Sequence, residues 1–395
     1  MRSTELQLMV TLWPSFPHFE RFAHTWDIAG IRLNSAMMHT HELETELEIV
    51  GDRWRDSSTR PLYFDVKGRQ PRVVEVIEND DQYLDLRLNH SVDFSLADPS
   101  GRPTGVLFKA GGDLAIIDRI EEDGRRLIFR KGYGPRYVVN PGESVCVKAD
   151  DFRILDGTFS AHELEKIRMV RDAGCKRWFL SYVESQDDVD QLLALVGEDA
   201  EIMLKIENKA GLRYVREEFD KSRNPNLRLV AACGDLYIEL DSPVDTLFSL
   251  REIIAADPDA IAGSRMMLSV MKDRHKERDE ELRDEYKEAD LCDFAHLAWL
   301  YDAGYRTMML CDEICLDETL LARGVHAFRF FARDYSAHRH VVQLHAELAP
   351  CSEEHEDPLA TYLFPTSEEI ESSTSLLPPP PEGFWTKAQR FLGLK

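Results

Sequence analysis

Short apolar runs alternate with amphipathic helical patterns along most of this chain. Two such runs, Glu201–Ile206 and Leu227–Ala232, are bounded by polar or turn-forming residues and predict strands. Between them, Leu212, Val215 and Phe219 recur at the three- and four-residue spacing of one helix face. A strand, a helix and a second strand in this order are typical of a parallel sheet. The pattern therefore places the chain in the α/β class.

The same rhythm of strands and helices extends over residues 1–72 and 152–340. Further strands are predicted at 6–12, 31–33, 61–64, 177–180, 260–263 and within 292–313. Helices are predicted at 18–28, where Gly30 is the stop signal, and at 42–49, 160–174, 187–196 and 244–255. Ser160 and Glu163 have the spacing of a capping box. Together with the two central strands this predicts a TIM (β/α)₈ barrel, whose usual length of ~250 residues matches the two stretches combined.

Residues 73–151 interrupt this rhythm with short β-like segments separated by turns rich in Asp, Asn, Pro and Gly. We predict a small all-β lid domain there, inserted into the barrel, with strands at 73–77, 83–88, 105–108, 114–117, 126–129 and 144–147. The charged run 272–288 predicts a solvated helix. Residues 341–395 are acidic and rich in Ser and Pro, which predicts a flexible tail, and the tail ends in a short amphipathic helix at 383–395.

The composition disfavours some classes of binding partner. The 395 residues include 72 acidic and 48 basic side chains, a formal charge of −24, which disfavours nucleic acid and anionic membranes as partners. The seven cysteines are scattered without a Cys-x-x-Cys pair, as is typical of reduced thiols in a cytoplasmic protein. Charged residues near the N-terminus argue against a secretory signal. No apolar run approaches the ~20 residues that span a bilayer.

Polar side chains with metal-binding chemistry follow the two central strands. Alternation along the first strand puts Lys205 and Glu207 on one face, and Asp235 follows the second strand directly after Gly234. Neighbouring strands lie about 4.8 Å apart, so Glu207 and Asp235 could bind one divalent cation with Lys205 beside it. Two carboxylates with open coordination positions suit Mg²⁺ or Mn²⁺. A cluster of surface ion pairs is the alternative interpretation.

Lys-Ile-Glu-Asn at 205–208, followed by Gly-Asp-Leu at 234–236, resembles the centre of pyruvate kinase. Gly-Ile-Arg-Leu-Asn at 30–34 and Phe-Asp-Val-Lys-Gly at 64–68 are similar to two earlier strands of that family. Met-Leu-Cys-Asp-Glu at 309–313 is similar to the Met-Leu-Ser-Gly-Glu of its last strand. The resemblance extends to about residue 335 and implies a pyruvate kinase-type barrel with a lid, without the family's C-terminal allosteric domain.

The resemblance also implies a role for each matching residue. Lys205 would lie at the transferring phosphoryl group of phosphoenolpyruvate, and ADP or ATP would be the co-substrate. The implied catalytic residues are Lys205, Arg32 and Arg72; the implied metal ligands are Glu207 and Asp235; and the implied substrate-binding residues are Gly234, Asp235 and Ser264.

Several positions depart from the family pattern on the monovalent-cation side. Ala36 and Met37 stand where the family has the cation-binding Ser and the following His, and Val66 stands where it has a Thr. Only Asn34 and Asp65 remain of the K⁺ ligands, so we expect no bound K⁺.

Cys233 stands directly before Gly-Asp-Leu, where the family has an Arg. The change removes a fixed positive charge next to the proposed metal ligands. The thiol has two interpretations, a nucleophile or a side chain that packs at the strand end, and the second is the more common in proteins.

The residues leave three functions open. The first is a divergent pyruvate kinase-like phosphotransferase that uses Mg²⁺. The second is a metal-dependent lyase or aldolase that acts on a 2-oxo acid through an enolate. The third is a catalytically inactive, pyruvate kinase-like binding protein. The substrate, phosphoenolpyruvate, pyruvate or a related 2-oxo acid, is not named by the sequence, and a homo-oligomeric state stays open.

Overall fold

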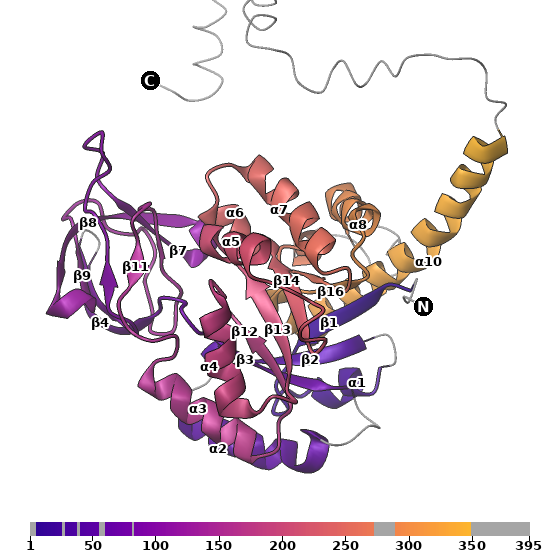
Figure 1. Cartoon of the computed structure of the whole chain (residues 1–395), viewed down its shortest axis with the longest axis horizontal. Helices are drawn as coiled ribbons and strands as arrows, with labels where there is room; N and C mark the ends of the chain where they lie inside the picture. The colour runs from indigo at the N-terminus through magenta and orange to yellow at the C-terminus, as the bar shows by residue number, and fades with distance from the viewer. Residues whose placement is uncertain are drawn as a thin grey trace, which may run out of the picture. The chain divides into compact units, whose positions relative to one another are not determined.

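The computed structural model describes residues 5–25, 28–37, 40–54, 60–80, 83–271 and 289–348. Within these residues, eight parallel strands close into a barrel, which confirms the predicted TIM-type fold (Figure 1). In order around the barrel, the strands are β1 (Gln7–Thr11), β16 (Thr307–Met309), β15 (Ile261–Gly263), β14 (Leu227–Ala232), β13 (Glu201–Ile206), β12 (Arg177–Leu180), β3 (Leu62–Val66) and β2 (Ile28–Asn34).

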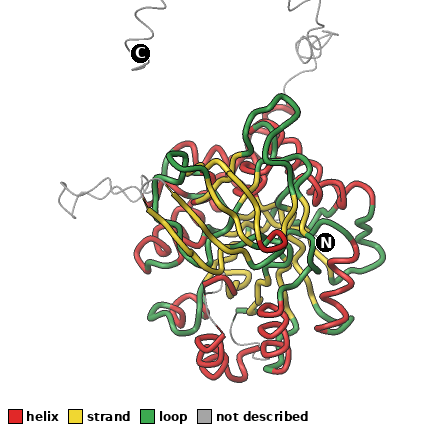
Figure 2. Tube along the Cα trace, turned by 90° about the vertical axis from the view of Figure 1, so that its left-hand side faces the viewer, coloured by secondary structure: helices red, strands yellow, loops and turns green. Residues whose placement is uncertain are grey.

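Helices follow the barrel strands along the chain and pack around them (Figures 1 and 2). The α-helices are α1 (Phe19–Ala23), α2 (Thr40–Val50), α3 (Ala161–Asp172), α4 (Gln186–Val196), α5 (Lys209–Glu217), α6 (Cys233–Glu239), α7 (Pro243–Ala256), α8 (Leu291–Ala303), α9 (Asp312–Cys315) and α10 (Glu318–Leu348). The 3₁₀ turns are η1 (Ser35–Met37), η2 (Gly51–Trp54), η3 (Lys109–Gly111), η4 (Glu122–Gly124) and η5 (Leu268–Met271). None of the described helices is long and apolar enough to cross a membrane.

An all-β insert lies between β3 and α3, and Figure 2 turns it toward the viewer. In the described residues it holds a six-stranded antiparallel sheet in the order β10 (Cys146–Val147), β7 (Gly105–Phe108), β8 (Asp113–Glu121), β9 (Arg126–Phe129), β5 (Tyr83–Leu88) and β4 (Val73–Asp80). A small ladder pairs β6 (Val92–Asp93) with β11 (Arg153–Ile154). The insert has its own hydrophobic core, separate from that of the barrel. Where the domain boundaries fall stays a prediction.

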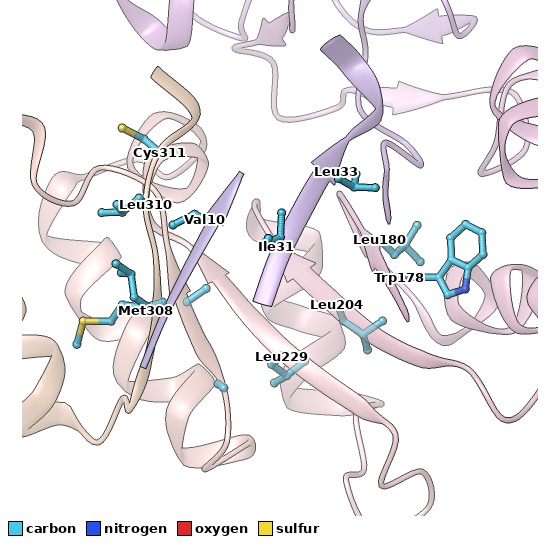
Figure 3. Close-up of a cluster of buried hydrophobic side chains, with 14 of the residues drawn as sticks. Val10, Ile31, Leu33, Trp178, Leu180, Leu204, Leu229, Met308, Leu310 and Cys311 are labelled. Carbon is cyan, nitrogen blue, oxygen red and sulfur yellow. The ribbon is translucent and has the colours of Figure 1, made fainter. Parts of the chain in front are cut away.

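The barrel core has two faces because successive side chains of a strand point to opposite sides. The outward side chains pack against the helices in one large cluster, part of which Figure 3 shows. The inward side chains fill the barrel with a smaller apolar cluster. This cluster consists of Met9, Tyr63, Phe179, Met203, Val230, Ile261 and Met309, with Ala29 beside it.

Two local predictions were wrong. The helix predicted at 18–28 is only the short α1, and Gly30 lies inside β2 instead of ending a helix. A Cβ atom at position 30 would lie 2.7 Å from Cε2 of Tyr63, so glycine is needed for close packing across that ring.

The capping box predicted at Ser160 and Glu163 is half formed. Ser160 Oγ accepts the N–H of Glu163 at 3.3 Å, whereas Glu163 Oε1 accepts the backbone N–H of Lys67 at 2.5 Å.

By its contacts the chain separates into two units, Met1–Ala337 and His338–Lys395, and the barrel and its insert lie in the first. Helix α10 runs to Leu348, past the start of the predicted tail. The charged helix predicted at 272–288 and the terminal helix predicted at 383–395 lie outside the described residues.

Candidate functional site

A layer of polar side chains lies above the apolar plug of the barrel, at the carboxyl ends of the strands. Each follows an inward-facing apolar residue by two positions, so strand alternation turns it inward as well. The pairs are Met9 and Thr11, Tyr63 and Asp65, Phe179 and Ser181, and Met203 and Lys205. Barrel enzymes keep their chemistry at this end.

Lys205 and Glu207 form a buried ion pair at the end of β13. The side chain of Glu207 is inaccessible to solvent and Lys205 is 7% exposed. Burial raises the pKa of Glu207 to about 7; attraction by Lys205 opposes this, and repulsion by Asp235 adds to it. Burial alone would lower the pKa of Lys205, but the negative charges of Glu207 and Asp65 outweigh it and leave that pKa raised. Lys205 Nζ also donates to Ser181 Oγ at 3.0 Å.

Asp65 is the centre of a second buried network. Its Oδ2 accepts from Arg32 Nε at 2.6 Å and from Lys67 Nζ at 2.8 Å, and its Oδ1 accepts from Ser181 Oγ at 3.1 Å. Burial works against the charged carboxylate, yet the Arg32 and Lys67 cations hold the pKa of Asp65 well below its usual range. Burial lowers the pKa of Lys67 to about 7, although Asp65 opposes the shift. Both oxygens of this remaining K⁺-ligand candidate are therefore occupied by protein groups.

Asp312 extends this network toward β16. Its Oδ1 accepts from Arg32 Nη1 at 2.6 Å, and its Oδ2 accepts from Asn34 Nδ2 at 2.6 Å. Burial alone would raise the pKa of Asp312, but attraction by Arg32 and Lys67 leaves it lowered.

The sequence did not single out Asp312, Ser181 or Lys67 as site residues. Period-two alternation from Phe179 would have turned Ser181 inward. The signal for Asp312 was its position in the segment similar to Met-Leu-Ser-Gly-Glu, where it replaces a glycine.

Gly234, Asp235 and Ser264 come together where α6 begins. The N–H of Gly234 donates to Ser264 Oγ at 2.8 Å, so the hydroxyl expected to contact substrate binds the backbone. Ser264 has a φ of +62°, a left-handed conformation that a non-glycine residue adopts at a cost. Asp235 lies in the first turn of α6, close enough to Glu207 and Lys205 to shift the pKa of both.

Arg72 lies at the junction between the barrel and the insert. Its Nε donates to Gln70 Oε1 at 2.9 Å, and its Nη1 contacts the carbonyl oxygen of Gly142. Burial lowers the pKa of Arg72, and attraction by Asp65 and Glu207 opposes that effect. Thus Arg72 is near the polar layer but is held by groups of the insert and its connection.

Cys233 packs in the barrel core, which confirms the second interpretation of this thiol. It is 4% exposed, its Sγ lies 3.6 Å from the carbonyl oxygen of Ala231, and burial raises its pKa to about 12. A thiol in that state is not an activated nucleophile.

The insert contacts α6 next to the polar layer. Lys148 Nζ of the insert donates to the carbonyl oxygen of Ile238 at 2.6 Å. On the barrel side, Tyr182 Oη, just after β12, donates to Glu239 Oε1 at 3.1 Å. A small cavity of about 40 Å³ lies in this contact and includes Cys146 and Asp235 in its lining. The insert therefore rests on the helix that carries one of the two proposed metal ligands.

The residues present fit a divalent cation of the Mg²⁺ type. Both oxygens of Glu207 are buried and neither accepts a hydrogen bond of good geometry, although the Lys205 ammonium is in ion-pair contact with one of them. The single Lys205 ammonium offsets only part of the cost of burying this carboxylate, and a divalent cation would take the remaining lone pairs. Among the described residues no group of three or more His, Cys, Asp or Glu side chains forms a metal cluster. Two carboxylates completed by water and substrate oxygens are sufficient for Mg²⁺, which keeps several waters.

The fold and the polar layer define a (β/α)₈-barrel protein of the kind whose ligands bind at the carboxyl ends of the strands. No protein-family model matches the sequence. The chain is similar to the pyruvate kinase of Methanocaldococcus jannaschii, with 24% identity over 266 residues. The match covers 62% of this chain and 52% of that protein, so the chain spans about half the length of the relative. This similarity indicates a distant relationship to pyruvate kinase, in line with the motifs.

Proposed function

We propose that the protein is a pyruvate kinase-like phosphotransferase that binds Mg²⁺ or Mn²⁺ together with phosphoenolpyruvate, pyruvate or a related 2-oxo acid. The observation that carries this proposal is the buried Lys205–Glu207 pair, with Asp235 beside it, at the carboxyl end of a closed barrel. The similarity to a pyruvate kinase supports it. ADP or ATP would be the second substrate.

The chemistry follows from the surroundings of each group. Glu207 and Asp235 would hold the cation, which when bound supplies positive charge to substrate oxygens. The hydrogen bond to Ser181 and the ion pair with Glu207 fix the Lys205 ammonium in place. A fixed ammonium with little access to water neutralises charge on a transferring phosphoryl group more effectively than a solvated one.

A second candidate, a metal-dependent 2-oxo acid lyase or aldolase that acts through an enolate, is favoured by one observation. Arg32, which by the resemblance to pyruvate kinase would contact the phosphate, already binds the carboxylates of Asp65 and Asp312. Chemistry on an unphosphorylated 2-oxo acid would not need that guanidinium.

The decisive experiment combines two assays on the full chain with Mg²⁺. One couples pyruvate formation from phosphoenolpyruvate and ADP to a reporter enzyme, and the other follows deuterium exchange into 2-oxo acids. Phosphotransfer that disappears in Lys205→Met, while the exposed, ion-paired control Lys209→Met keeps it, supports the proposal. Exchange without phosphotransfer supports the lyase or aldolase. If neither occurs although Mn²⁺ and oxalate bind, the chain is an inactive binding protein.

A further inference from the structure

The guanidinium of Arg32 is bound on two sides by carboxylates. Its Nε and Nη2 lie 2.6 and 2.5 Å from Asp65 Oδ2. Its Nη1 donates to Asp312 Oδ1 at 2.6 Å and lies 3.2 Å from Thr11 Oγ1. The donors that could form a bidentate pair with a phosphoryl group are therefore shared between two acidic side chains.

Solvent exposure separates the two carboxylates. The side chain of Asp65 is inaccessible to solvent and that of Arg32 is 8% exposed, whereas that of Asp312 is 30% exposed. Asp312 is thus the more solvent-accessible of the two carboxylates that bind the guanidinium.

Asp312 adds a second negative charge to a guanidinium that is already paired. Asp65 shares its one negative charge between Arg32 and Lys67, and Arg32 also pairs with the carboxylate of Asp312. In a site that receives a phosphorylated substrate, the substrate itself would bring that second negative charge.

We propose that Asp312 is a specificity-determining residue that takes the place of a substrate anion on Arg32 and weakens the binding of phosphorylated ligands while leaving that of unphosphorylated 2-oxo acids unchanged. This inference rests on the proposed function in one respect, that the ligand binds at the Lys205–Glu207 end of the barrel. A phosphoryl group must displace Asp312 from Arg32 Nη1 or bind beside its negative charge. A substrate carboxylate that binds next to Glu207 and Asp235 neither displaces Asp312 nor lies beside its negative charge.

The test is calorimetry on the full chain in the presence of Mn²⁺, with phosphoenolpyruvate and oxalate titrated separately. Asp312→Asn removes the charge and keeps the shape, and Asp312→Gly removes the side chain. Glu313→Gln is the matched control, because it neutralises the next residue in sequence, which is exposed to solvent. We expect both Asp312 variants to bind phosphoenolpyruvate at least about tenfold more tightly than the wild type. Their affinity for oxalate should change by less than about twofold, and Glu313→Gln should behave as the wild type.

Three results would overturn the inference: unchanged affinity for phosphoenolpyruvate in Asp312→Asn, an equal gain for oxalate, or an equal gain in Glu313→Gln. Failure of the proposed function looks different, because the wild type would then take up no Mn²⁺ with oxalate. In that case inorganic phosphate titrated without metal still decides the role of Asp312. Asp312→Asn must bind it at least about tenfold more tightly than the wild type, or the inference is wrong.

Discussion

At the residue scale, Glu207 is a buried carboxylate with a second carboxylate, that of Asp235, beside it. Repulsion by Asp235 adds to the cost of ionising the buried Glu207, and the Lys205 ammonium offsets only part of that cost. We expect Glu207→Gln and Asp235→Asn each to lower Mn²⁺ affinity by at least about a hundredfold and to leave the fold intact, because both replacements keep the size of the side chain. Lys205→Met should spare Mn²⁺ binding and abolish turnover. Electron paramagnetic resonance of Mn²⁺ with oxalate present measures the first effect, and retained affinity in either acid variant would contradict the metal assignment.

Glu163 offers a test of buried charge outside the proposed metal site. Burial raises its pKa from 4.5 to about 7, although the N–H of Lys67 opposes the shift, and its Oε2 is buried without a hydrogen-bond partner. The folded protein therefore holds this proton more tightly than the unfolded chain does. Its contribution to stability is complete below pH 4.5 and is lost as the pH rises toward 7.

We accordingly expect Glu163→Gln to be more stable than the wild type by about 2 kcal/mol at pH 8 and to lose that advantage near pH 4. Urea denaturation at both pH values measures the difference, and titrating groups remote from Glu163 cancel in the comparison. Glu165→Gln, an exposed neighbour on α3, is the control and should show no such dependence. An equal effect of Glu163→Gln at both pH values would mean that folding does not raise the pKa of Glu163.

At the residue scale, local alternation predicted that Lys205 and Glu207 share a face, because the rule needs only the strand itself. The same reasoning could not reveal the contact between Arg32 and Asp312. These residues are 280 positions apart, and only the closure of the barrel brings them together.

Among the elements, the ends of β2 and β3 explain why we expect no activation by K⁺. Ala36 and Val66 supply no hydroxyl, Asn34 Oδ1 accepts the N–H of Ala36 at 3.2 Å, and Asp65 binds three protein donors. A large monovalent cation would find too few free oxygens there. Turnover, or oxalate affinity in the presence of Mn²⁺, should be the same within about twofold in Na⁺, K⁺ and tetramethylammonium buffers. A severalfold rise specific to K⁺ would show that these side chains rearrange around the ion.

Element prediction succeeded where the pattern was strong. The strands β12, β13 and β14 have the bounds that their apolar runs predicted. It failed at α1 and β2, where glycine was interpreted as a helix stop although it serves a close contact with Tyr63. Secondary-structure propensity reflects the backbone freedom of a glycine. It does not show the side chain of another strand whose close packing requires that glycine.

On the scale of the molecule, Lys205 and Glu207 are both buried. We expect the contact between the insert and the barrel to open when a ligand reaches them. Gly111 of η3 and Ile238 of α6 allow this to be tested. A Cβ atom on Gly111 would lie 3.1 Å from Cγ1 and 3.6 Å from Cγ2 of Ile238, so side chains at the two positions would be in contact and the pair is a candidate for an engineered disulfide. The left-handed φ of +83° at Gly111 would cost the cysteine about 1 kcal/mol.

We expect the oxidised double variant Gly111→Cys/Ile238→Cys to lose at least about tenfold in the association rate of oxalate with the Mn²⁺-loaded protein, and dithiothreitol to restore it. Each single cysteine variant under the same oxidant is the control. If the cross-linked protein, verified by mass spectrometry, takes up oxalate at the wild-type rate, then the ligand enters without movement of the insert.

The closure of the barrel has a consequence for how the chain folds. Strand β1 pairs with β16, with Gln7 opposite Thr307, whereas β12 to β15 each pair with their neighbours in sequence. The entropy of loop closure makes the β1–β16 pairing the costliest strand pairing to form. The second half of the barrel can therefore assemble while one edge of β1 is still unpaired. During synthesis on the ribosome, this edge of β1 stays unpaired at least until residue 309 has been made. The pairing of β1 with β16 also brings Arg32 to Asp312. The charged layer at this end of the barrel is therefore among the last parts of the molecule to form.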